Sequence, residues 1–123
     1  MAEDAKILID RAARSFLDEV PALKPLTLVV GIDLHGRGDT QQFRLELPDI
    51  EVRKDIAADA RVRIEMRREF FNAMVEHGAR VADWREAFIH GQAKATGVEQ
   101  YMRLIINVVE RQEERNRTRK ARH

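Results

Sequence analysis

The stretch Trp84–Val109, WREAFIHGQAKATGVEQYMRLIINVV, decides the fold, because it combines a short helix, a glycine stop, a short strand and a long apolar helix. Asp83 and Glu86 have the spacing of a capping box at the first helix start, and Gly91 suits the left-handed residue that ends that helix. Residues 94–96 then predict a strand. The second helix carries an apolar stripe at Val98, Tyr101, Met102, Ile105, Val108 and Val109. A stripe of this width requires an apolar surface beneath it.

The residues before this stretch predict a helix, a run of strands and another helix. Residues 3–20 have apolar side chains at helical spacing, and Pro21 ends that pattern. Alternating or β-branched patterns predict strands at 26–34, 41–47, 50–53 and 61–66. Helical spacing returns from Phe70 and ends near Gly78. Strands grouped in one run and helices in another indicate an α+β domain with helices on one face of a sheet.

The composition bounds the class of protein. A chain of 123 residues, 44% hydrophobic and 35% charged, is the size of one domain with one core. It has no cysteine, no secretory signal and no apolar run long enough to span a bilayer, so we expect a cytoplasmic protein. The net charge of +1 conceals an asymmetry, because residues 111–123 carry +4. We therefore expect a domain at 1–110 and a basic C-terminal tail at 111–123.

Three short motifs follow one another in the order and spacing of a known family. They are Ala87-Phe88-Ile89-His90-Gly91, Lys94-Ala95-Thr96-Gly97 and Met102-Arg103-Leu104. With the strands before them, they resemble the sterol carrier protein type 2 family over about residues 26–109. The resemblance implies a five-stranded, mainly antiparallel sheet covered by helices and an apolar tunnel. It also implies non-catalytic binding or transfer of a lipid, fatty acyl chain or sterol.

On this resemblance, apolar residues of three helices are the candidates for lining the tunnel. They are Phe70, Phe71, Met74, Trp84, Phe88, Met102, Ile105 and Val109. Ala93 and Ala95 are small where the family often has larger apolar residues, which would widen or reshape a cavity. Periodicity alone does not separate a cavity wall from an ordinary core, where such residues occur more often. The alternative is a structural or interaction module with a closed core and no ligand, in which the helix at 3–20 forms a homodimer face or binds a partner protein.

Signals for catalysis, metals and cofactors are weak. The four histidines are scattered, and no nucleotide-binding or nucleophile motif occurs, so we expect no catalytic residue, no metal site and no cofactor. A small isomerase that uses Tyr101 and Asp33 as acid and base is a remote alternative, because no paired pattern supports it.

The basic tail suggests a second kind of contact. Each basic residue close to an anionic lipid surface contributes about 1 kcal/mol of attraction. We therefore expect weak, transient docking to anionic membranes, although a solvated helix end explains the same charges. Nucleic acid is not an expected partner, because the tail has no aromatic residue on which bases could stack. The docking residues would be Arg115, Arg117, Arg119, Lys120 and Arg122.

Overall fold

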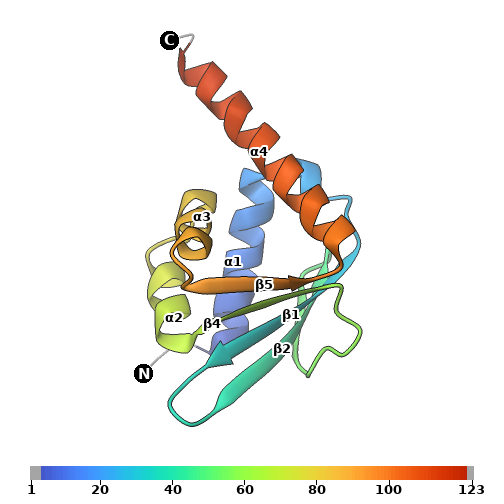
Figure 1. Ribbon diagram of the computed structural model, residues 1–123, viewed down its shortest axis with the longest axis vertical. Helices are drawn as coiled ribbons and strands as arrows, with labels where there is room; N and C mark the ends of the chain where they lie inside the picture. Colours follow the sequence, from blue (N-terminus) through green and yellow to red (C-terminus); the bar gives the residue numbers. More distant parts are fainter. Residues whose placement is uncertain (1–3, 122–123) are drawn as a thin grey trace.

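The computed structural model describes residues 4–121 and consists of one open sheet with helices packed against it (Figure 1). The elements are α1 (Ala5–Glu19), a 3₁₀ turn η1 (Pro21–Leu23), β1 (Leu28–His35), β2 (Thr40–Leu47), β3 (Glu51–Lys54), β4 (Val62–Arg67), α2 (Arg68–Glu76), α3 (Val81–Ile89), β5 (Ala93–Gly97) and α4 (Glu99–Ala121). The strand order is β3-β2-β1-β4-β5. Strands β1 and β4 are parallel, and the other neighbouring pairs are antiparallel. The expected α+β fold with a five-stranded, mainly antiparallel sheet is confirmed.

Helix α1 packs across the inner face of the sheet. The Asp4 side chain caps it by accepting a hydrogen bond from the Lys6 N–H (2.9 Å). Its apolar residues belong to the same core cluster as the inward residues of β1, which include Leu28 and Val30. The buried positions on this helix are Leu8, Ile9, Ala12, Ala13 and Leu17. The apolar residues considered for dimerisation therefore pack within the chain, and the formation of a homodimer stays a prediction.

The outer face of the sheet is polar and includes a buried carboxylate that pairs with an arginine. Asp33 on β1 is 7% exposed, and its Oδ1 accepts a hydrogen bond from Nη1 of Arg63 on the neighbouring strand β4 (2.7 Å). A buried carboxylate requires such a partner, because desolvation without one costs several kcal/mol. Arg63 also donates through Nη2 to the carbonyl oxygen of Ile56 (2.6 Å). This residue therefore ties the segment 55–61 to the sheet.

A second arginine holds the same segment. Arg44 Nη2 donates to Asp59 Oδ2 (2.8 Å). The segment ends at Arg61, whose carbonyl oxygen accepts from the Val98 N–H (2.8 Å), directly before α4. The ion pairs on the outer face thus help to fix the residue from which α4 starts.

The Arg44–Asp59 pair predicts a pH dependence of stability. The hydrogen bond from Arg44 lowers the pKa of Asp59 below its usual 3.8. The unfolded chain therefore binds a proton at Asp59 more readily than the folded chain does. The contribution of the Arg44–Asp59 pair to stability is fully present above the ordinary pKa of the carboxyl group. It is lost as pH falls through the lower pKa of Asp59 in the folded chain. We expect Asp59→Asn to lower the urea midpoint at neutral pH, with the difference from wild type shrinking between about pH 5 and pH 3. In a protein that already carries Arg44→Gln, Asp59→Asn should have little effect on the urea midpoint. If Asp59→Asn lowers the midpoint by the same amount there, the stabilising partner of Asp59 is a residue other than Arg44.

Helix α3 begins three residues earlier than the sequence indicates. It starts at Val81, and the Asp83 carboxylate accepts a hydrogen bond from the Arg80 N–H (2.9 Å). The expected capping box of Asp83 and Glu86 is therefore wrong, and Glu86 instead pairs with Nε2 of His90 (3.0 Å). The helix ends as expected, because Gly91 has a φ of 73° and follows the last turn.

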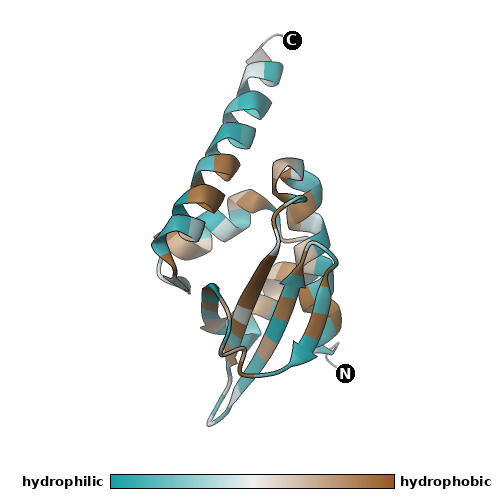
Figure 2. Cartoon of the chain, turned by 90° about the vertical axis from the view of Figure 1, so that its right-hand side faces the viewer, coloured by the Kyte–Doolittle hydropathy of each residue, from teal (hydrophilic) through white to brown (hydrophobic). Residues whose placement is uncertain are grey.

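Helix α4 continues well beyond the body of the domain (Figure 1). Apolar bands occupy its first half, whereas the second half is polar (Figure 2). The boundary expected at residue 110 falls inside this continuous helix. Of the predicted docking residues, Arg122 lies outside the described residues, and only the backbone of Lys120 is described. The division into domain and tail stays a prediction.

Candidate ligand-binding site

A cavity of about 750 Å³ lies between the inner face of the sheet and the helices. This volume is within the range of about 300–1,000 Å³ that is usual for small-molecule sites. Its wall is almost entirely apolar, and Lys94 is its one charged residue in the described part of the chain. Every helix and four of the five strands contribute to the lining, with Ile9 and Phe16 from α1, Ile32 from β1, Leu45 from β2, Ile64 from β4 and Ala93 from β5 among them.

Five of the eight residues that the sequence suggested lie together in this wall. They are Phe71 on α2, Trp84 and Phe88 on α3, and Met102 and Ile105 on α4. Their aromatic rings form a connected row: the Trp84 ring centroid is 6.3 Å from that of Phe71 and 6.3 Å from that of Phe88. Such spacing allows ring-to-ring contact. The row gives the α2–α3 side of the cavity a continuous aromatic surface.

The other three suggested residues do not line the cavity. Phe70 and Met74 are partly buried on α2 and pack against the main core. Val109 packs in a second cluster, with Leu17 and Leu23. These three residues fill space beside the cavity. They lie on a different side of their helices from the residues that line it.

Helix α4 covers the cavity without being buried itself. None of its described side chains is buried, although its apolar stripe includes Met102 and Ile105 in the cavity wall. Ile106 also lines the cavity and is 52% exposed. An ordinary core helix would bury this stripe against side chains. Here Met102 and Ile105 face the cavity, whereas Tyr101, Val108 and Val109 pack against the core clusters.

Strand β5 supplies the narrow side chains that leave this volume open. Ala93 and Ala95 line the cavity opposite Met66 and Ile64 of β4. At the end of the strand, Gly97 has a φ of 142°, and a Cβ there would lie 2.2 Å from the carbonyl oxygen of Arg61. Glycine is therefore required where β5 passes closely over the chain and turns into α4.

Sequence reasoning missed the α1 and sheet contributions to the wall. The missed residues include Ile9, Ala12, Ala13 and Phe16 on α1, and Leu28, Val30, Ile32 and Leu45 on the sheet. The alternation within strands identified the inner-face positions, but it did not tell which of them face open space. That information depends on the side chain opposite each position.

The two groups considered for acid–base chemistry lie apart in the described part of the chain. Asp33 is paired with Arg63 on the outer face, whereas Tyr101 packs against the inner core, so these two groups do not meet. Within residues 4–121, no group of three His, Asp or Glu side chains could hold a metal ion. No helix in this range is long and apolar enough to cross a membrane.

Solved structures with this arrangement include sterol carrier proteins from Aedes aegypti and Yarrowia lipolytica. A crystal structure of sterol carrier protein 2-like 2 from Aedes aegypti is 19% identical, with a TM-score of 0.53 over 76% of this chain and 84% of that one. At this low sequence identity, the similarity between the two chains lies in their fold. The chain has the sterol carrier protein 2 fold. Sterol carrier protein 2 from Yarrowia lipolytica, in its apo form, is 17% identical, with a TM-score of 0.52 over 79% of this chain and 86% of that one.

A third sterol carrier protein 2 structure is a solution structure of palmitated SCP2-like 2 from Aedes aegypti. It is 16% identical, with a TM-score of 0.54 over 81% of this chain and 93% of that one. Neither a protein-family sequence model nor a curated protein sequence matches the chain. At this level of identity the likeness to the sterol carrier protein 2 structures concerns the fold.

Proposed function

We propose that this protein binds a lipid, fatty acyl chain or sterol non-covalently in the cavity under α4, and carries or presents it without catalysing a reaction. One observation carries the proposal: an apolar volume of about 750 Å³ remains beneath a helix whose apolar stripe is only partly buried. Burial of hydrocarbon there contributes about 25 cal/mol per Å² of apolar surface, so chain length should govern affinity more than the head group does. The palmitated relative with the same fold supports this choice of ligand class.

The single tryptophan provides a direct test. Trp84 lines the cavity between Phe71 and Phe88. Titration with a fluorescent long-chain fatty acyl probe should quench its emission, saturate at one probe per protein, and reverse when unlabelled fatty acid or sterol is added. A Trp84→Phe variant should bind the probe with similar affinity, measured by the probe's own fluorescence, but without the tryptophan signal. A folded monomer that binds none of these ligands would exclude the carrier function and favour the closed-core interaction module.

Transient docking to anionic membranes remains a separate proposal. Arg115, Arg117 and Arg119 are exposed on the projecting half of α4. Arg115 and Arg119 line a groove beside η1, whereas Arg117 does not. The positive charge is therefore divided between two sides of the helix. Because only part of it can face a membrane at one time, we expect the attraction to an anionic surface to be weak. Co-sedimentation with anionic but not zwitterionic vesicles at low salt is the expected result.

A further inference from the structure

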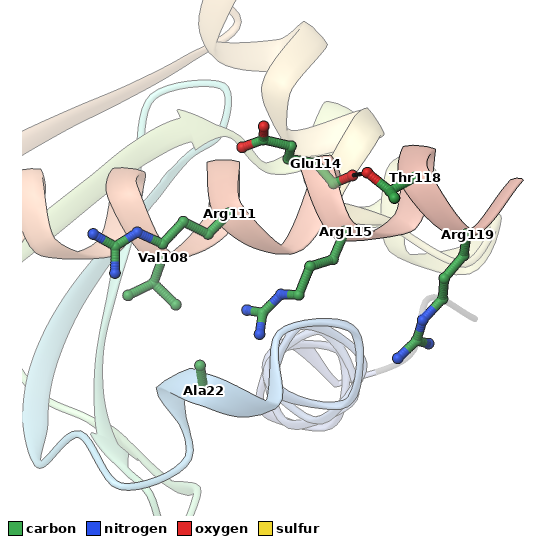
Figure 3. A pocket seen from close by; sticks show the side chains of 7 residues that line it. All are labelled: Ala22, Val108, Arg111, Glu114, Arg115, Thr118 and Arg119. Carbon is green, nitrogen blue, oxygen red and sulfur yellow. Dashed lines mark hydrogen bonds between the residues drawn. The ribbon is translucent and has the colours of Figure 1, made fainter. Parts of the chain in front are cut away.

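A second hollow adjoins the cavity farther along α4, beside η1. This groove, of about 720 Å³, is lined by Ala22 of η1 and by Val108, Arg111, Glu114, Arg115, Thr118 and Arg119 of α4 (Figure 3). Its apolar end lies beside the cavity, since Val108 is one helical turn from Ile105 and Ala22 is next to Leu23 in the chain. Ile105 and Leu23 line the cavity itself. The two hollows therefore have adjoining walls along the contact between α4 and η1.

Three arginines dominate the polar end of the groove. Arg111, Arg115 and Arg119 are four residues apart, which places successive side chains about 6 Å apart along one side of a helix. Figure 3 shows Arg115 and Arg119 reaching toward the side of η1, while the Glu114 carboxylate lies at the opposite edge of the helix. The long, flexible side chains of two successive arginines on this side of the helix can thus converge on one oxyanion.

Three acidic side chains near the groove have partners other than the groove arginines, whereas Glu114 lines the groove itself. At the end of α1, Asp18 pairs with Lys24 (3.8 Å), and Glu19 accepts from the Val81 N–H (3.2 Å). On α4, Glu113 pairs with Arg85 of α3. Within residues 4–121, none of the three groove arginines forms an ion pair with these groups. Their charges remain available to a ligand.

We propose that this groove binds the phosphate or carboxylate head group of an amphiphile whose hydrocarbon chain lies in the cavity. This inference rests on the proposed function and narrows it, because it selects anionic lipids over sterols and other neutral ligands. The apolar wall supplies affinity for any chain of suitable length. The arginine groove supplies the preference among head groups.

The test compares two ligands with the same chain, dodecyl phosphate and dodecanol, by displacement of the fluorescent acyl probe. Wild-type protein should prefer the phosphate, and Arg111→Gln/Arg115→Gln should weaken phosphate binding about tenfold while changing dodecanol binding less than about twofold. The preference should also decrease with added salt, because the arginines are exposed. The matched control is Arg37→Gln/Arg117→Gln, which removes the same charge from two exposed positions outside the groove and should bind like wild type.

The remaining outcomes separate this inference from the proposed function. Equal binding of both ligands, unchanged in the groove variant, would overturn the head-group site and leave the carrier function intact. Binding of neither ligand by folded wild type would end both proposals. Glycerol phosphate binding as tightly as dodecyl phosphate would make the groove a site for free phosphate. A groove variant that loses only its binding to anionic vesicles, with amphiphile binding retained, would assign the arginines to membrane docking instead.

Discussion

Replacing Met102 with Asp should abolish ligand binding while the protein stays folded. Met102 is half-buried on α4 and lines the cavity, so a carboxylate there would have to be desolvated beside the bound hydrocarbon chain. A loss of about a hundredfold or more in affinity is expected, which corresponds to about 2.7 kcal/mol. The measurement is displacement of a fluorescent acyl probe, with circular dichroism to establish that the variant is folded.

The same helix provides the control for this change. Leu104 is 45% exposed and does not line the cavity, so Leu104→Asp should retain binding. Helix α3 provides a second pair, because Phe88 lines the cavity whereas Ile89, 66% exposed, does not. If the Met102→Asp and Leu104→Asp variants bind the ligand with equal affinity, the ligand-binding site does not lie beneath α4.

Replacing Gly97 with Ala should destabilise the whole domain. The added Cβ would lie 2.2 Å from the Arg61 carbonyl oxygen and 2.8 Å from the Val62 Cα, and both of these are backbone atoms. The backbone φ of 142° is also unfavourable for any residue except glycine. We expect the free energy of unfolding to fall by about 3 kcal/mol or more, measured by urea denaturation.

Gly38 separates the two causes of this loss. It too has a positive φ, 80°, but a Cβ there would meet no atom within 4 Å. Gly38→Ala should therefore cost only the left-handed backbone penalty, about 1 kcal/mol. If both variants lose the same stability, the close approach of β5 to Arg61 is not what requires glycine at position 97.

The local patterns predicted the elements well and their partners poorly. Alternation in residues such as Val62, Ile64 and Met66 identified β4 as a half-buried strand. The same alternation occurs in parallel and antiparallel strands, so the parallel pairing of β4 with β1 could not be read from it. That pairing depends on where the segment 55–61 crosses the sheet, which is fixed by long-range contacts such as Arg44 to Asp59.

The candidate site was only partly predictable for a related reason. Helical spacing placed Phe71, Trp84 and Met102 on inward faces, and all three line the cavity. It placed Phe70 and Val109 on similar faces, yet these pack in filled regions. Whether an inward residue meets a side chain or open space depends on elements that are far away in the sequence. The periodicity of apolar residues therefore does not predict it. The net charge of the tail did not predict the basic groove, because it does not distinguish the sides of a helix. Arg115 and Arg117 are two residues apart, so they point to different sides of α4.

The uncovered stripe of α4 has a consequence for heat resistance. If the proposed ligand supplies part of the hydrophobic core of this domain, the empty and loaded forms should melt at different temperatures. A ligand at a hundred times its dissociation constant adds about 2.7 kcal/mol to the folded state. A simple melting curve would therefore report how much of a purified sample still carries the lipid it acquired in the cell.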